Sequence, residues 1–220
     1  MAKIEVKNVT KIIKGNKVAD NISLTLESPR VVGFKGKNGS GKTMLMRLIC
    51  GLIYSTDGTV AIDGKVLGKD ISFPSSVGLL LENPAFIDDY SAFDNLKLLF
   101  SVKGVLSDSD IHSALERVGL GDTGKKKYKK FSLGMKQRLG IAAAVAESPD
   151  IVILDEPTNS LDESGVELAK TIVAEEKSRG ALVIVSCHDE EALELLSDEI
   201  YTISDGKITG HRILRGETNG

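Results

Sequence analysis

The chain has 220 residues, of which 41% are hydrophobic and 27% are charged, and its formal net charge is −3. These proportions are ordinary for a globular domain, and the small negative charge excludes the broad positive field of a general nucleic-acid binder. No apolar run reaches the roughly 18 residues that a transmembrane helix needs, and we expect the alternating residues 1–5 to form a strand rather than a signal peptide.

The first third of the chain predicts β-strands joined by tight turns. Apolar and polar residues alternate on both sides of Lys14-Gly15-Asn16, and Asp63-Gly64 is typical of a two-residue hairpin turn. Strands are expected over 4–9, 18–26, 30–34, 59–62 and 76–81.

The middle of the chain changes to helical periodicity. Acidic residues after Ser107 predict a helix N-terminus, and Gly119 is expected to end that helix. A second helix is expected between Ser132 and Pro149, because apolar residues recur there at helical spacing.

The last third alternates strands with helices. We expect strands over 151–154 and 181–186, helices over 162–180 and 190–196, and a final hairpin over 199–214. This order implies parallel strands joined by helical crossovers. The sequence therefore predicts an α/β fold with a mixed, largely parallel sheet.

A glycine-rich loop that fits the phosphate-binding pattern G-x-x-x-x-G-K-[ST] is the most specific motif. Glycines let backbone N–H groups converge on crowded phosphate oxygens, and the helix expected over 42–50 would point its N-terminus at the anion. Lys42 can then reach the terminal phosphates, and the Thr43 hydroxyl can bind Mg²⁺. A loop that binds nothing is the weaker alternative. The loop residues are Gly36, Lys37, Asn38, Gly39, Ser40, Gly41, Lys42 and Thr43.

Two acidic residues, Asp155 and Glu156, follow the strand expected over 151–154. In a parallel sheet this strand ends at the same edge as the phosphate loop. Asp155 is therefore expected to hold Mg²⁺ together with Thr43. Glu156 is then left to act as a base toward an attacking water. The alternative is an acid pair that only caps a helix.

His188 follows the strand expected over 181–186, which would place it near the terminal phosphate. A lone histidine there is more often structural, but the two phosphate motifs favour a functional role. For His112 and His211 we expect ordinary surface positions.

The cysteines, Cys50 and Cys187, are expected to be reduced thiols in the core. A catalytic role for Cys187 is a weaker interpretation, and a disulfide is weaker still.

The segment Ser132-Leu133-Gly134-Met135 begins the second helix of the middle third. A serine followed by a glycine at a helix start favours anion binding. Because the chain already has a complete phosphate loop, the simplest interpretation is that this segment serves the nucleotide of a partner subunit.

Together these motifs resemble the ATP-binding cassette (ABC) ATPases, and the resemblance covers nearly the whole chain. In that family a phosphate loop, a glutamine-containing loop, a signature, an acidic strand, a D-loop and a switch histidine follow in one order. Glu82 stands at the glutamine position, and the D-loop is Asn159, Ser160, Leu161 and Asp162.

The resemblance implies one P-loop NTPase domain over 1–220, with an N-terminal antiparallel β subdomain and an α-helical subdomain inserted at approximately 84–148. It implies ATP and Mg²⁺ as cofactors, and ATP hydrolysis by Glu156, His188 and Lys42. It also implies a head-to-tail dimer, a homodimer in the simplest case, in which each signature acts on the nucleotide of the other subunit.

The signature spelling and Glu82 are similar to those of the ATPases of bacitracin-resistance and related ABC-2-type exporters. That branch implies a cytoplasmic subunit on the inner face of the cell membrane, which powers a separate membrane-spanning permease. Nucleic acid is not an expected partner. The alternatives are a soluble ABC ATPase of DNA repair or translation and a nucleotide-binding regulator without catalysis.

Four positions depart from the family pattern. Leu133 replaces the first glycine of the signature, and Glu82 adds negative charge near the expected metal. Ile13 stands where the family often has an aromatic residue that stacks on adenine, so the base selectivity is left open. Lys37 adds positive charge near the phosphates.

Two further stretches allow two interpretations each. The aromatic residues Phe86, Tyr90 and Phe93 fit either a surface that receives the membrane subunit or the core of the helical subdomain. The basic run over 125–130 fits a solvated loop, or contact with lipid headgroups or a partner.

Overall fold

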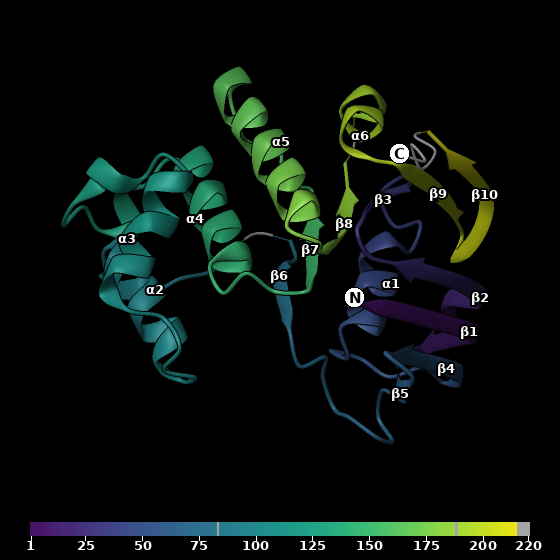
Figure 1. Cartoon of the computed structure of the whole chain (residues 1–220). Helices are drawn as coiled ribbons and strands as arrows, with labels where there is room; N and C mark the ends of the chain where they lie inside the picture. Colours follow the sequence, from purple (N-terminus) through teal and green to yellow (C-terminus); the bar gives the residue numbers. More distant parts are fainter. Residues whose placement is uncertain (83, 188, 215–220) are drawn as a thin grey trace.

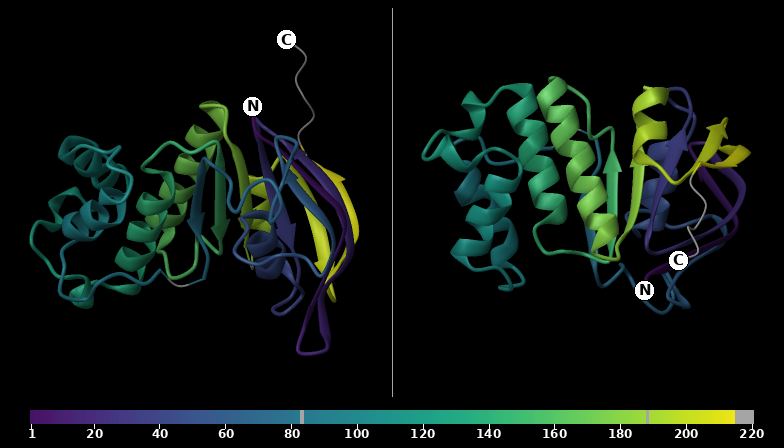
Figure 2. Two further views of the ribbon diagram at one scale, coloured as in Figure 1. Left: turned by 90° about the horizontal axis from the view of Figure 1, so that it is seen from below. Right: turned by 45° about the horizontal axis from the view of Figure 1, so that its top comes forward.

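The computed structural model describes residues 1–82, 84–187 and 189–214, which form two β-sheets and a set of helices (Figures 1 and 2). The strands are β1 Lys3–Ile13, β2 Asn16–Glu27, β3 Arg30–Lys35, β4 Asp57–Ile62, β5 Lys65–Val66, β6 Val77–Leu80, β7 Ile151–Asp155, β8 Leu182–Ser186, β9 Glu199–Ser204 and β10 Lys207–Ile213. The α-helices are α1 Lys42–Ile49, α2 Ala92–Ser101, α3 Asp108–Arg117, α4 Leu133–Val145, α5 Glu163–Ser178 and α6 Glu190–Leu196. Within the described ranges, no helix is both long and apolar enough to cross a membrane.

The larger sheet has the strand order β10-β9-β3-β8-β7-β6. Its strands are parallel to their neighbours except β10, which is antiparallel to β9. Strands β3, β7 and β8 therefore end at one edge, where ligands bind in sheets of this kind. The predicted α/β fold with a mixed, largely parallel sheet is confirmed.

The smaller sheet is antiparallel and has the order β2-β1-β4-β5. Helix α1 lies between the two sheets, and apolar side chains from all three, such as Ile4, Val32 and Leu45, form one core (Figure 1). The strand predicted over 4–9 continues to Ile13 through several register shifts, so β1 reaches the edge of the site described below.

The opposite face of the larger sheet packs against α4, α5 and α6, and α2 and α3 lie beyond α4 (Figure 1). Successive residues of the inner strands belong to different cores: Val183 faces the helices, whereas Ile184 faces the smaller sheet. Burial on both faces explains why these strands are continuous apolar runs in the sequence.

Helix α2 is not among the elements predicted from the sequence. Its Leu96 is buried, but Leu98 and Leu99 are half-exposed, so apolar residues surround the helix and obscure the helical period. The signal that could have revealed it is its capping box, in which the Ser91 hydroxyl accepts from Asp94 N–H at 3.1 Å.

Helix α3 is joined to α5 by ion pairs around Glu176, whose residue exposure is only 1%. The Glu176 carboxylate lies 2.9 Å from Arg117 Nη1 and 2.5 Å from Arg179 Nη2. Arg117 also contacts Glu175 at 2.7 Å, but the Glu175 side chain is half-exposed. The buried carboxylate therefore neutralises two guanidinium groups that are only partly in water.

We expect Glu176→Ala to lower the free energy of unfolding by about 3 kcal/mol, because it removes the buried partner of two charges. The matched change Glu175→Ala removes a half-exposed partner of the same arginine and is expected to cost less than about 1 kcal/mol. Urea unfolding of both variants measures the difference. Equal losses in the two variants would contradict this account.

Candidate functional site

The loop over 36–43 connects the carboxyl end of β3 to the N-terminus of α1. Two of its glycines are sterically required. A Cβ on Gly36 would lie 2.4 Å from Ser40 Oγ, and Gly41 combines a φ of +111° with a Cβ position 2.9 Å from Val18 O. The loop is therefore wrapped tightly and lies against β2.

Lys42 is buried, and its ammonium group donates to Gly36 O at 2.7 Å and to Lys37 O at 3.3 Å. The first turn of α1 contains no acidic residue. The helix dipole and the ammonium charge thus act together on the loop. This arrangement can stabilise a bound anion.

Asp155 is the last residue of β7, and the Thr43 hydroxyl donates to its Oδ2 at 2.5 Å. The structure therefore brings together the two residues that the sequence assigns to a metal. A hydroxyl and a carboxylate are hard oxygen ligands, and Mg²⁺ is usually bound by one or two such groups together with substrate phosphates and water. The donor set fits Mg²⁺ beside the phosphate loop.

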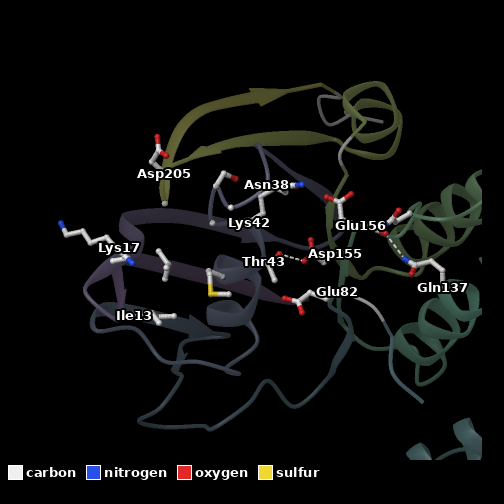
Figure 3. Close-up of a pocket in the computed structure, with 18 residues that line it drawn as sticks. Ile13, Lys17, Asn38, Lys42, Thr43, Glu82, Gln137, Asp155, Glu156 and Asp205 are labelled. Carbon is white, nitrogen blue, oxygen red and sulfur yellow. Dashed lines mark hydrogen bonds between the residues drawn. The ribbon is translucent and has the colours of Figure 1, made fainter. Parts of the chain in front are cut away.

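Glu156 follows Asp155 with a φ of +54°, which turns the chain sharply at the end of β7. Its carbonyl accepts from Gln137 Nε2 at 2.9 Å, which ties the turn to helix α4. Figure 3 shows the Glu156 side chain beside Asp155 at the cavity, on the side of Gln137.

Glu82 follows β6 and also has a positive φ, +59°. Its carboxylate lies 2.8 Å from Nη2 of Arg47, and Arg47 belongs to the last turn of α1. The negative charge that departs from the family pattern is therefore paired with a cation in this structure.

Loop residues 38–43, Glu82, Gln137 and the acid pair line one cavity of about 770 Å³ (Figure 3), whereas Gly36 and Lys37 do not line it. At one end stand the acid pair, Glu82 and Gln137. At the other end are the β1–β2 hairpin, represented by Ile13 and Lys17, and the turn between β9 and β10. The phosphate loop lies between the two ends.

The hairpin end contains residues to which the sequence assigns no role. Besides Ile13, the described residues that line it are Asn16, Lys17, Val18, Asp205 and Gly206, and none of these is aromatic. Gly206 N donates to Ser40 O at 2.8 Å, which joins the turn to the phosphate loop. No local sequence motif predicts a role for these residues, because they come together only when the two sheets pack.

The signature segment lies elsewhere. Of the described residues that line the cavity, none belongs to 132–135. Ser132 caps α4 by accepting from Met135 N–H at 3.2 Å, and Leu133 is 70% exposed. The N-terminal residues of α4 therefore do not line the cavity of their own chain, although Gln137, farther along the helix, does.

The D-loop follows the acid pair and lies against the signature. A Cβ on Gly134 would lie 3.0 Å from Ser160 O, and Ser160 has a φ of +62°. Asp162 caps α5 as predicted, since its carboxylate accepts from Gly165 N–H at 2.9 Å. Asn159 lines the cavity.

His188 lies outside the described residues. The neighbouring Cys187 is buried, and burial raises the pKa of its thiol to about 12. A thiol that stays protonated is a poor nucleophile, so burial favours the predicted core thiol over the catalytic interpretation of Cys187. Cys50 is also free and buried, in agreement with the predicted core thiols.

The remaining histidines have surface positions, as predicted. The His112 ring stacks on Phe93, with 4.6 Å between ring centroids. His211 Nε2 lies 2.6 Å from Oε2 of the buried Glu199. Neither residue lies at the cavity.

The two ambiguous stretches are partly explained by local contacts. Phe86 and Phe93 pack against the helical core, whereas Tyr90 is 41% exposed. In the basic run, Lys129 lies 2.5 Å and Lys127 3.6 Å from the same oxygen of Asp89. The Asp89 carboxylate thus offsets part of the positive charge.

Residues 19–159 match the family model described as "ABC transporter". The chain is 50% identical over 205 residues to the uncharacterized ABC transporter ATP-binding protein YybJ of Bacillus subtilis, covering 93% of this chain and 94% of that protein. The chain belongs to the ABC transporter family.

Two further relatives have names that include a transported compound. The lantibiotic transport ATP-binding protein SrtF of Streptococcus pyogenes is 35% identical and is aligned over 98% of this chain and 93% of its own length. The bacitracin transport ATP-binding protein BcrA of Bacillus licheniformis is 36% identical, with coverage of 93% and 68% respectively. The predicted resemblance to bacitracin-resistance ATPases is confirmed.

Among solved structures, the dimeric ATP-binding cassette MJ0796 in a post-hydrolysis state, bound to ADP and Pi, superposes with a TM-score of 0.87. The sequences are 25% identical, and the match covers 97% of this chain and 99% of that one. The fold is thus that of an ABC ATPase cassette.

Proposed function

We propose that this chain is the ATP-binding and ATP-hydrolysing subunit of an ABC transporter, and that it powers a separate membrane permease of the ABC-2 exporter type. The main support for ATP hydrolysis is the 2.5 Å hydrogen bond from the Thr43 hydroxyl to the Asp155 carboxylate. It joins a phosphate loop and an acidic strand end in one cavity, which is the arrangement that phosphoryl transfer requires.

In ATP hydrolysis, the residues of the cavity would have different roles. The loop amides and Lys42 hold the phosphates, while Thr43 and Asp155 hold Mg²⁺. When bound, Mg²⁺ neutralises charge on the phosphate oxygens. Glu156 accepts a proton from the attacking water, since its carboxylate is separate from the metal pair. His188, from the family pattern, would contact the terminal phosphate.

A second subunit would complete the site. None of the described signature residues lines the cavity at the phosphate loop of this chain, and the exposed N-terminus of α4 is free of acidic residues in its first turn. A head-to-tail dimer would direct Ser132 and Gly134 to the nucleotide of the partner, with D-loop residues Ser160 and Asp162 nearby. The dimeric state of the solved cassette supports this arrangement.

The assignment to an exporter is supported by the names of two similar proteins. SrtF and BcrA are named for the transport of lantibiotics and of bacitracin. By analogy, this chain would act at the cytoplasmic face of the membrane by closing its dimer on ATP and moving a permease. The cargo would be selected by that permease, and nucleic acid would have no part.

A regulator that binds nucleotide without hydrolysing it is the second candidate. Ile13 and Glu82 favour it, because both depart from the family pattern beside the cavity. The presence of Lys42, Asp155 and Glu156 in the same cavity favours hydrolysis instead.

Glu156→Gln is expected to lower the rate of ATP hydrolysis by at least about 100-fold, because general-base catalysis contributes that much. Binding of Mg-ATP should remain, since the phosphate loop is unchanged. Phosphate release and ATP binding measure the two effects. Glu163→Gln, an exposed acid of α5, is the matched control. Turnover near that of the wild type in Glu156→Gln would exclude Glu156 as the base.

Ile13→Tyr is expected to tighten ATP binding about fivefold, because an aromatic ring can stack on the base. Ile12→Tyr is the matched control, since Ile12 is 43% exposed, against 37% for Ile13, but does not line the cavity. Calorimetry in the Glu156→Gln background gives both affinities. Equal affinities in the two variants would show that the base does not lie at the hairpin end.

The transporter assignment predicts co-purification of a polytopic membrane protein in stoichiometric amount from detergent-solubilised membranes of the source organism. The protein tagged at its C-terminus is the bait, and mass spectrometry identifies its partners. Recovery with ribosomes or DNA-repair factors instead would support a soluble ABC ATPase and contradict the exporter assignment.

A further inference from the structure

Ser186, the last residue of β8, is completely buried and pairs with Asp155 in the parallel register of β7 and β8. Its hydroxyl donates to Oδ1 of Asp155. The same hydroxyl oxygen accepts from the backbone N–H of Glu156 at 3.2 Å. One buried side chain thus contacts both members of the acid pair.

The Asp155 carboxylate is held at both oxygens. Thr43 of α1 donates to Oδ2, and Ser186 of β8 donates to Oδ1. Hydrogen bonds to a charged acceptor are stronger than neutral ones. The carboxylate therefore has little freedom to rotate.

Thr43 belongs to the nucleotide loop, whereas Ser186 does not. If the Thr43 hydroxyl turns to Mg²⁺, the Ser186 hydroxyl remains as a side-chain donor to Asp155. Because Ser186 lies in a buried strand, we expect its hydrogen bond to Asp155 to be the same with and without a nucleotide in the phosphate loop.

Glu156 is fixed at the same point. Its N–H is directed at both the carbonyl oxygen of Ser186, at 3.1 Å, and the Ser186 hydroxyl, at 3.2 Å. Its φ of +54° is unfavourable for a residue with a Cβ and persists only where neighbouring contacts hold it. Ser186 supplies contacts of this kind.

We infer that Ser186 is a positioning residue, which orients the Asp155 carboxylate toward Mg²⁺ and holds the turn that presents Glu156 to the attacking water. The inference rests on the proposed function, since it assigns Mg²⁺ to Asp155 and the base to Glu156. A hydrogen-bonded partner of a metal-ligating carboxylate commonly changes metal affinity 10–100-fold when it is removed.

The test measures metal binding apart from turnover. The affinity of the non-hydrolysed analogue adenylyl imidodiphosphate is determined by calorimetry in EDTA and across a Mg²⁺ series. In Ser186→Ala, the Mg²⁺ concentration that gives half of the maximal change in nucleotide affinity should rise about tenfold or more. The affinity in EDTA should stay within about twofold, because Ser186 does not line the nucleotide cavity.

Ser197→Ala is the matched control. Ser197 is also completely buried, and its hydroxyl finds no hydrogen-bond partner among the described residues. It precedes β9 and does not line the cavity, so the same chemical change there should leave the Mg²⁺ dependence unchanged. An equal shift in both variants would overturn the inference.

Ser186→Cys provides a second variant with nearly the same volume but a weak hydrogen-bond donor. It should give the same rise in Mg²⁺ requirement even if Ser186→Ala does not fold, and melting temperatures report on folding. A folded Ser186 variant whose nucleotide affinity depends on Mg²⁺ as in the wild type would overturn the inference. An equal loss of nucleotide affinity with and without Mg²⁺ would also overturn it. If the wild-type protein itself fails to bind the nucleotide, the proposed function fails instead.

Discussion

The contact between the Thr43 hydroxyl and the Asp155 carboxylate joins two parts of the chain that are 112 residues apart in sequence. It exists because β3 and β7 both pair in parallel with β8, so that the loop after β3 and the acid at the end of β7 emerge at one edge of the sheet. If either strand ran the other way, the loop and the acid pair would lie at opposite ends of the sheet. The site thus depends on strand direction before it depends on any single side chain.

The other end of the cavity depends on the packing of the two sheets. Gly41 lies close to Val18 of β2, and Gly206 joins the β9–β10 turn to the same loop. The hairpin that carries Ile13 is therefore fixed relative to the phosphate loop, although its side chains offer no ring for stacking. Affinity for a nucleotide would then come mainly from charge and backbone donors at the phosphates, and less from the base.

The sequence was sufficient for features with a local signal. The phosphate loop has a fixed spacing, and strands buried on both faces are continuous apolar runs, so Lys42 and Asp155 could be placed at one sheet edge in advance. Gln137 and Ser186 carry no such signal, because each meets Glu156 only after separate elements have packed. Helix α2 was missed because half-exposed leucines on its outer side obscure the helical period.

Arg117 also attaches the helical part of the molecule to α5. This residue ends α3 and binds two consecutive carboxylates of α5, one of them inaccessible to water. If α2 and α3 were to rotate, an attachment of this kind at one end of a helix would act as a pivot. Rotation of α2 and α3 against the sheet would leave the α3 C-terminus nearly stationary and displace the parts farthest from it most, so that a small tilt at α5 becomes a larger translation at the outer surface.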